Sequence, residues 1–557
     1  MRQLNSWSNF FAKKAGYPKR YRRHEEKHKN SVSLCLCGRS LVVFLVISLL
    51  AGCNFPAQKS PAFVAPSEYE MAAAPTAENT LLPSETPPES EASAMIEPGS
   101  PTPEAAAMAT PIPTETPIPA KPDGPLLYYT QAGDTLAALS VRFGVRPDEI
   151  ESTTTLPAWG FINPNQLLII PQRFTNTTSS AHLLPDSEIV YTLSAIDFDT
   201  IQYVNDAGGY LQNAHDYFGS NGEVSGAEIV YKTALDNSIN PRLLLALLEF
   251  QSGWVFGQPA TQTGEEYPLG HIIYNDRGLA DQLKWAVNQL SIGYYGWREG
   301  RLSEITFTDG VVAHLAPDLN AGTAALQYYF AQIYDSKTWL AALDSKTGLP
   351  AIYEQMFGSP WMRAQVVEPL FPPDIEQPEL ELPFIPERTW SYTGGPHGAW
   401  EKDGSWAAID FAPATSVSGC VRSDAWVTAV GDGIVTRAER GIVVLDLDGD
   451  GFEQTGWVMI YLHIATEGRT GSNRVVKAGD LLGHPSCEGG HATGTHVHIA
   501  RKYNGEWIAA DGPIPFTLSG WAAHSAGEPY KGTLTQNDDT ITASQYGSGV
   551  SVIMLEE

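Results

Sequence analysis

Residues 457–464 read Trp-Val-Met-Ile-Tyr-Leu-His-Ile, and residues 496–500 read His-Val-His-Ile-Ala. In both stretches every second residue is aliphatic, and the histidines lie at the positions between. A repeat of two residues is typical of a β-strand, in which successive side chains point to opposite faces. We therefore expect each strand to turn one apolar face to a core and to place its histidines on the other face. The apolar set of the first strand consists of Val458, Ile460, Leu462 and Ile464, and the opposite set consists of Met459, Tyr461 and His463. Short strands and glycine-rich turns around both stretches predict a mostly β domain.

The histidines of the second stretch can share a metal ion with two residues upstream. His496 and His498 lie two residues apart on a strand, so they project together, about 6–7 Å apart at the backbone. A catalytic zinc ion needs three nitrogen or oxygen ligands and one open position for water. Asp410 ends another short apolar strand, and His397 lies in Gly394-Gly-Pro-His397-Gly. We expect zinc as the cofactor, held by His397, Asp410 and His498.

The order of these residues resembles the lysostaphin-type zinc endopeptidase family over residues 390–515. The resemblance rests on a histidine, Asp410, Tyr461-Leu-His463 and Gly494-Thr-His496-Val-His498, with further matches at 427–435 and 476–483. It implies an antiparallel sheet and zinc bound by Asp410 and His498. It also implies that His463 and His496 are catalytic, orienting the water, moving protons and stabilising the tetrahedral intermediate.

The sequence departs from that family at the first zinc ligand. The family places this histidine four residues before the aspartate, where this chain has Trp406, and an indole cannot ligate zinc. The nearest upstream histidine is His397, thirteen residues before Asp410, with a glycine-bounded insertion between them. A loop can return His397 to the metal, because coordination constrains geometry rather than spacing along the chain. Without that return, the domain would be a non-catalytic relative that activates other wall hydrolases.

Five cysteines divide between the start of the chain and this domain. Cys420 and Cys487 lie in the domain and predict a disulfide in an exported protein, with a buried free pair or a metal role as alternatives. Cys53 follows an apolar run, LVVFLVISLL at 41–50, in a segment that resembles the lipobox of bacterial lipoproteins. That run suits a signal peptide and is shorter than the roughly 20 residues of a membrane span. We expect lipidation at Cys53, with a plain signal peptide or an uncleaved anchor as alternatives.

Other polar residues of this domain have simpler interpretations. His484 and His491 flank Cys487 in a glycine-rich loop and are expected to be structural or to line the rim of the substrate site. Asp446, Asp448 and Asp450 have the spacing that opens a calcium loop, but the twelfth position is Trp457 instead of an acid. We expect a turn between two strands there, with calcium as the alternative.

Residues 127–173 form a separate unit with its own motif. Gly133-Asp-Thr135-Leu leads into helical spacing that stops at Gly144, and Asn165-Gln-Leu-Leu-Ile-Ile-Pro closes as a strand. This segment resembles the LysM domain, a βααβ unit whose family binds glycans that contain N-acetylglucosamine, such as peptidoglycan. Asn165 stands where the family has glycine, and asparagine tolerates the left-handed conformation of that turn. The alternative is a LysM unit that is purely structural.

Residues 190–367 are expected to be mostly helical. Pro241 starts a segment that is apolar nearly all round and therefore buried. The stretch ending at Gln251-Ser252 resembles lysozyme-like lytic transglycosylases, in which a glutamate at the position of Gln251 is the general acid. An amide cannot donate a proton at useful acidity, and Glu249 lies about 200° around the helix. We expect a catalytically inactive glycan cradle of lysozyme-like ancestry, with a structural helical spacer as the alternative.

The remaining segments and the charge set the cellular context. We expect a signal peptide over 1–52, a disordered Pro-, Thr- and Glu-rich linker over 53–124, a second linker over 368–387, the peptidase over 388–521 and a tail over 522–557. Residues 1–52 carry ten basic and two acidic side chains, a net +8, so the formal charge of −28 leaves −36 for the rest. Such an acidic chain is a poor partner for nucleic acid.

These features predict a multidomain, lipid-anchored, extracytoplasmic protein of the cell envelope. Its expected function is a zinc metalloendopeptidase that cuts peptide cross-links of peptidoglycan, with the LysM unit binding the glycan and the lipid anchor binding the membrane. The alternative is a non-catalytic scaffold that binds peptidoglycan or activates a cell-wall hydrolase.

Overall fold

The structure is a computed structural model that describes residues 124–556 except 220, 221 and 416. The expected signal peptide, the lipidation site at Cys53 and nearly all of the first linker lie outside the described residues. All described residues fall within one compact unit, 112–557. Among them, no helix has the length and apolar character needed to cross a membrane.

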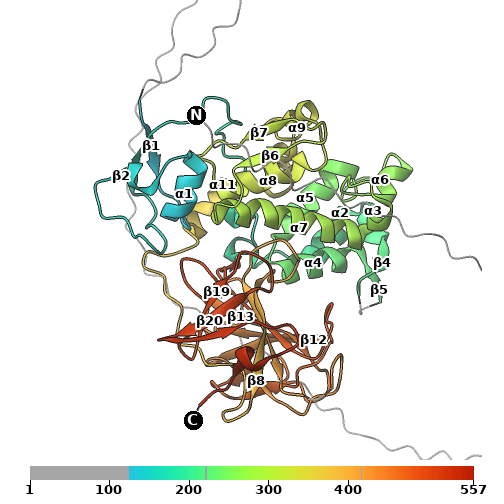
Figure 1. The fold of residues 1–557 in the computed structure, drawn as a ribbon. Helices are drawn as coiled ribbons and strands as arrows, with labels where there is room; N and C mark the ends of the chain where they lie inside the picture. Colours follow the sequence, from blue (N-terminus) through green and yellow to red (C-terminus); the bar gives the residue numbers. More distant parts are fainter. Residues whose placement is uncertain (1–123, 220–221, 416, 557) are drawn as a thin grey trace, which may run out of the picture. The chain divides into compact units, whose positions relative to one another are not determined.

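The first described region, drawn in blue in Figure 1, is a small three-stranded antiparallel sheet beside one helix. Thr135 caps the helix by accepting from the Ala138 N–H, and Gly144 ends it in the left-handed conformation. Asn165 has a φ of 65°, as expected for a residue in the place of glycine. The second predicted helix is a single 3₁₀ turn, because the chain extends again at Glu151 to pair with the last strand. The elements are β1 (Leu126–Tyr129), α1 (Leu136–Phe143), η1 (Pro147–Glu149), β2 (Glu151–Ser152) and β3 (Leu167–Ile170), in the order β1-β3-β2.

The second region is helical, as expected, and is drawn in green to yellow in Figure 1. Asn240 caps α5 and Pro241 occupies its first turn, so the predicted buried helix begins where the sequence places it. Two hairpins, β4–β5 (His215–Tyr217, Glu223–Ser225) and β6–β7 (Glu304–Thr306, Val312–His314), interrupt the helices. The helices are η2 (Asp186–Glu188), η3 (Leu193–Ala195), α2 (Thr200–Ala207), α3 (Tyr210–Asn213), α4 (Gly226–Asn237), α5 (Pro241–Ser252), α6 (Gln262–Glu266), η5 (Tyr274–Asp276), α7 (Leu279–Arg298), α8 (Ala321–Ala331), α9 (Ser336–Ala342), α10 (Leu349–Phe357) and α11 (Pro360–Val367).

The third region is the predicted β domain, drawn in orange to red in Figure 1. Its main sheet, nine-stranded among the described residues, has the order β14-β11-β12-β13-β16-β9-β8-β22, with β17 paired to β16. Its pairings are antiparallel. The strands are β8 (Trp390–His397), β9 (Ala408–Pro413), β11 (Gly433–Glu439), β12 (Gly441–Asp446), β13 (Trp457–Ile464), β14 (Arg474–Val476), β16 (Val497–Tyr503), β17 (Glu506–Trp507) and β22 (Val552–Ile553).

The segments expected to be a linker and a tail are folded parts of this domain. Leu382 and Phe384, from the 368–387 stretch, are buried in the core of the β domain. Beyond residue 521 the chain continues into a four-stranded sheet, and β22 pairs with β8 to form the edge of the main sheet. The smaller elements are β10 (Val427–Thr428), β15 (Leu481–Gly483), β18 (Thr517–Leu518), β19 (Trp521–Ser525), β20 (Gly532–Gln536), β21 (Asp539–Thr542) and η6 (Gly549–Ser551).

Both faces of β13 are covered, the predicted apolar face and the face that the alternation assigns to His463. Met459 and Tyr461, placed on that face by the alternation, belong to the core of the β domain. Val458, Ile460 and Leu462 instead belong to the core cluster of the helical region. The sheet is therefore covered on both faces, because the face that the sequence assigns to its own core packs with the helices.

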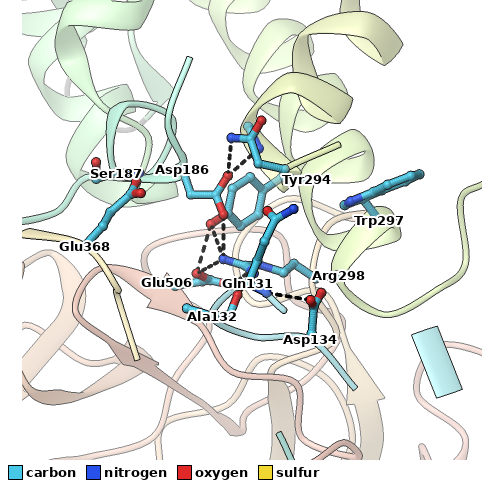
Figure 2. A network of polar contacts seen from close by, with 12 residues as sticks. Gln131, Ala132, Asp134, Asp186, Ser187, Tyr294, Trp297, Arg298, Glu368 and Glu506 are labelled. Carbon is cyan, nitrogen blue, oxygen red and sulfur yellow. Dashed lines mark hydrogen bonds and ion pairs between the residues drawn. The ribbon is translucent and has the colours of Figure 1, made fainter. Parts of the chain in front are cut away.

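Arg298, the last residue of α7, connects all three regions through polar contacts (Figure 2). Its guanidinium pairs with Asp186 of the helical region at 2.9 Å and with Glu506 of β17 at 3.0 Å, and it donates to the Ala132 carbonyl of the first region. The Tyr294 hydroxyl also donates to Glu506, at 2.9 Å. Burial raises the pKa of Glu506 to about 7, although Arg298 acts in the opposite direction. An ion pair as buried as this costs desolvation, which only several simultaneous contacts offset.

Candidate metal centre

Three adjacent strands bring His397, Asp410 and His498 together. His498 on β16 lies opposite Asp410 on β9, and Asp410 lies opposite Gly394 on β8, three residues before His397. A Cβ on Gly394 would lie 2.4 Å from the Asp410 carboxylate, so the close approach of that carboxylate requires glycine. Neighbouring Ile409 and Ile499 point into the domain core, which leaves the ligating side chains on the opposite face of the sheet.

The ligand atoms form a compact triangle. His397 Nε2 and His498 Nδ1 lie 3.0 Å apart, and each lies 3.3 Å from Asp410 Oδ1. Tetrahedral zinc with bonds of about 2.0–2.1 Å separates its ligand atoms by about 3.3–3.4 Å. The three residues are only 2 to 6% exposed. The spacing and the N,N,O donor set both fit zinc.

Hydrogen bonds to backbone carbonyls orient the rings of His397 and His498 so that the lone pairs of their other nitrogens point to the centre of the triangle. His397 Nδ1 lies 2.8 Å from the Gly395 carbonyl, and His498 Nε2 lies 2.9 Å from the Ala399 carbonyl. A carbonyl only accepts, so these nitrogens carry the protons, and the facing nitrogens of the neutral rings are unprotonated. Among the described residues, Asp410 Oδ1 has no hydrogen-bond partner of good geometry although it is buried. Two lone pairs and a carboxylate oxygen facing one another repel, and a shared cation removes that repulsion.

The charge states suit a cation at neutral pH. Burial alone would raise the pKa of Asp410, but His397 and His496 nearby bring it well below its usual range. Burial also lowers the pKa of His498. The cluster therefore presents an anionic carboxylate and a neutral imidazole, the forms that bind metal.

His463 and His496 lie beside this triangle. Their ring centroids are 4.4 Å apart, and His496 Nε2 is 3.9 Å from Asp410 Oδ1. Each places its Nδ1 at a backbone carbonyl, that of Glu488 for His463 and that of Gly494 for His496, at 2.9 and 2.8 Å. Their Nε2 atoms are therefore unprotonated in the neutral rings. Burial, followed by the charges of His496 and His498, lowers the pKa of His463 to about 3.

His463 reaches this face through a feature that alternation does not predict. Strict alternation groups His463 with Tyr461, whose side chain lies in the core of the β domain. His463 instead has a φ of 65°, in the left-handed region, and the β12–β13 register shifts at this point. The bulge turns the imidazole toward the face of His498, with ring centroids 6.3 Å apart. The predicted residue is at the cluster, although the predicted reason is wrong.

The predicted disulfide between Cys420 and Cys487 is present and holds two loops beside the cluster. Cys487 immediately precedes Glu488, whose carbonyl orients His463. On the other side, the Val421 N–H donates to the Thr495 hydroxyl at 2.8 Å, and Thr495 precedes His496. The covalent bond thus connects the segments that orient both candidate catalytic histidines.

The other predicted positions are accounted for outside the cluster. Trp406 lies beneath the Arg301 guanidinium, 5.7 Å from the ring centroid, and takes no part in the triangle. His484 packs against Trp426, and His491 is exposed. The three aspartates near residue 448 place carboxylates close together, and Asp446 accepts from the backbone of its own turn. In the helical region, Gln251 accepts a hydrogen bond from the Tyr334 hydroxyl at 2.5 Å.

Two residues at the cluster have no counterpart in the sequence predictions. Tyr530 stacks on the His397 ring at 4.1 Å, and it comes from the stretch expected to be a tail. Ala399 supplies the carbonyl that orients His498, and it lies in the insertion after His397. The role of a backbone carbonyl cannot be recognised from the residue type, and the sequence of the predicted tail has no excess of aromatic residues that would indicate a folded segment.

The chain is similar to the protein LasA. Residues 182–370 match the family model described as the N-terminal domain of LasA. Two curated proteins, both named Protease LasA and both from Pseudomonas aeruginosa, are 27% identical to this chain over 288 and 291 residues. Each match covers 49% of this chain and 65% of the relative, so the chain spans just under two thirds of the length of these relatives.

Solved structures also resemble parts of the chain. One is described as the novel M23 metalloprotease pseudoalterin from the deep sea, with 21% identity, a TM-score of 0.26, and coverage of 30% of this chain and 96% of that chain. The catalytic domain of the antimicrobial peptidase lysostaphin from Staphylococcus simulans has 20% identity, a TM-score of 0.16, and coverage of 22% and 89%.

The comparisons bear on the helical region as well. Its predicted span of 190–367 coincides closely with the match to the LasA N-terminal domain, while the lysozyme-like and LysM resemblances stay predictions. About half of the chain is therefore similar to Protease LasA, with the match to the N-terminal domain of LasA on the helical region, and this similarity supports a peptidase.

Proposed function

We propose that this protein is a zinc metalloendopeptidase that cleaves peptide cross-links of peptidoglycan. The observation that carries the proposal is the triangle of His397 Nε2, His498 Nδ1 and Asp410 Oδ1, with separations of 3.0 to 3.3 Å. The similarity to proteins named Protease LasA supports the same reaction class. The proposal assigns His397, Asp410 and His498 as the residues that hold zinc.

The residues around the triangle have separate tasks in this proposal. Bound zinc polarises a carbonyl and lowers the pKa of water to about 7. Burial lowers the pKa of His463, so its resting ring is neutral, and its Nε2 is free to accept a proton because Nδ1 faces the Glu488 carbonyl. His496 presents the same atom from the neighbouring strand. The two imidazoles accept the proton of the attacking nucleophile and deliver a proton to the leaving amine.

The rest of the chain keeps the enzyme at its substrate. We assign glycan binding to residues 127–173 and membrane anchoring to a lipid on Cys53, which place the protein in the cell envelope as a lipoprotein. Outside residues 1–52 the formal charge is −36, a charge that an anionic wall repels. Two attachments offset this repulsion by raising the effective concentration of the peptidase at peptidoglycan.

Metal analysis of the full chain tests the proposal. Purified wild type is expected to hold about one zinc per chain, and His397→Ala is expected to lose it. The matched control is His491→Ala, an exposed histidine close to His496 in sequence, which is expected to retain zinc. Release of new amino groups from purified peptidoglycan then measures cleavage. A wild type without zinc overturns the proposal, and zinc without cleavage favours the scaffold or activator alternative.

A further inference from the structure

The insertion between His397 and Asp410 contacts the helical region and the candidate metal centre at once. Its apolar members Ala399, Ala407 and Trp400 pack with the core of the helical region. Gly404 comes so close to α7 that an added Cβ would lie 3.0 Å from the Ser291 Cβ. The insertion is therefore held between the sheet and α7 instead of projecting into solvent.

The end of α7 and the residues after it grip this insertion through polar contacts. Arg301 donates to the Gly404 carbonyl at 3.2 Å, and its guanidinium lies over Trp406. Glu299 pairs with Arg301 at 2.6 Å and accepts from the Ser405 hydroxyl at 3.4 Å. Just before Gly404, the Asp403 N–H donates to Asn288 Oδ1 of α7 at 3.3 Å.

Ser405, which contacts Glu299, also fixes the position of the Ala399 carbonyl, and this carbonyl orients the metal ligand His498. The Ala399 N–H donates to the Ser405 carbonyl at 3.0 Å, so the position of residue 405 sets that of residue 399. The Ala399 carbonyl in turn receives the hydrogen bond from His498 Nε2 at 2.9 Å. An unbroken series of contacts thus runs from Glu299 and Arg301 to the ring of His498.

We propose that Glu299 and Arg301 are positioning residues for the metal centre, and that they act through the insertion on His498. This inference rests on the proposed function, because it assigns a role toward the proposed zinc. The insertion has no regular secondary structure of its own between β8 and β9. Without anchors it would sample many conformations, and the Ala399 carbonyl would not fix which nitrogen of His498 faces Asp410.

The proposal implies that the helical region and the metal centre are thermodynamically coupled. If the contacts of α7 strengthen metal binding, metal binding strengthens those contacts by the same free energy. The helical region is then part of the metal centre's framework. It also gives the thirteen-residue spacing a role, because residues between His397 and Asp410 make the contacts with α7 and the residues after it.

Cobalt titration of the full chain tests the proposal, with Co²⁺ as a spectroscopic probe of the zinc position. Arg301→Ala is expected to weaken Co²⁺ binding about tenfold, the lower end of the effect of outer-shell changes, and to alter the visible absorption band. Arg301→Lys keeps a cation beside Glu299 and one donor for the Gly404 carbonyl, so it is expected to recover part of the affinity. The matched control is Arg277→Ala. Arg277 pairs with Glu266 at 2.6 Å in the helical region, before α7, and removing this arginine–glutamate pair is expected to leave Co²⁺ binding and the band unchanged.

The outcomes separate this inference from the proposed function. Wild type that binds neither Zn²⁺ nor Co²⁺ overturns the proposed function itself. Wild type that binds metal, with Arg301→Ala equal to it in affinity and spectrum, overturns the positioning role alone. If Arg301→Ala does not fold, Glu299→Gln replaces it, because the amide loses the charge that pairs with Arg301, and unchanged metal affinity and spectrum in that variant overturn the inference.

Discussion

The helical region and the β domain each place a buried polar group where a hydrolase would carry its chemistry, and they leave different atoms without a partner. In the helical region, Gln251 accepts from Tyr334, and its buried amide nitrogen has no partner among the described residues. In the β domain, the corresponding group is Asp410, whose buried Oδ1 has no hydrogen-bond partner among the described residues and faces two imidazole nitrogens. A spare N–H donor cannot hold a cation or act as an acid, whereas a carboxylate with two nitrogen neighbours can ligate metal. The type of the unpartnered atom, more than its burial, separates a scaffold from a candidate active site.

The largest effect on the contrast between the two regions is expected from a change at Asp410. Asp410→Asn keeps the shape of the side chain but removes the anionic oxygen and introduces a donor that faces the histidine lone pairs. We expect zinc to be lost and cleavage of peptidoglycan to fall to background, because zinc needs all three ligands. Zinc content by mass spectrometry and release of amino groups measure the two effects. A variant that retains stoichiometric zinc would remove Asp410 from the ligand set.

The counterpart in the helical region is Gln251→Ala, for which we expect no change in zinc content or cleavage. A drop in cleavage at unchanged stability would mean that the helical region contributes to catalysis, and the contrast between the regions would then be wrong.

A substitution at His463 tests whether the β domain can bind zinc and yet lose proton transfer. His463→Ala is expected to retain zinc, because the side chain lies outside the triangle, while kcat falls by about 10²–10⁴-fold. Steady-state kinetics on a soluble cross-linked peptide, together with metal analysis, check the result, and His491→Ala serves again as the control. Loss of zinc in the variant would make His463 a ligand instead of a proton carrier.

A disulfide is expected to contribute to the stability of the β domain and not to that of the helical region. The helical region contains no cysteine, and the β domain holds the Cys420–Cys487 bond, which closes a separation of 67 residues. Replacing both cysteines by serine is expected to lower the free energy of unfolding by about 2–4 kcal/mol. Denaturant unfolding measured with and without reductant provides the test. The wild type should respond to reductant and the double variant should not, and equal responses would contradict a structural role of the bond.

Much of the candidate site follows from local sequence patterns. The alternation around His496 and His498 places both rings on one face, and the structure keeps them there, opposite Val497 and Ile499 of the core. The cap and the start of α5 at Asn240 and Pro241 also follow from residue type alone. These predictions succeed because the cause lies within a few residues of the effect.

The remaining features depend on contacts between distant segments. No local pattern shows that Tyr530 stacks on His397, or that residue 404 meets α7. The bulge that turns His463 toward the cluster depends on the register with β12, which the sequence of β13 does not contain. The packing of both faces of the sheet could not be predicted for the same reason. Alternation identifies an apolar face, but it does not show which segment of the chain covers that face.

The smallest expected effect concerns Glu506, where the two regions meet. Its carboxylate is surrounded by Arg298, Tyr294 and Tyr295 of α7 and by Asp186, and burial raises its pKa to about 7 despite the arginine. A raised folded-state pKa means that the folded protein holds this proton more tightly than the unfolded chain does. The contribution to stability is thus fully present below the unfolded pKa of about 4.5 and is lost as the pH rises through 7.

Glu506→Gln replaces the titrating group with a neutral one, so its stability relative to wild type is expected to increase from pH 5 to pH 8. Thermal unfolding of both proteins across this range measures the difference, and a constant difference would show that Glu506 does not titrate there. An increase would mean that Arg298 offsets the desolvation of Glu506 only in part, because a charge that its partner fully compensated would keep an ordinary or lowered pKa. The contact between the helices and the sheet would then be least stable where Glu506 is ionised. Under the coupling proposed for α7, the metal centre would lose part of its support over the same pH range.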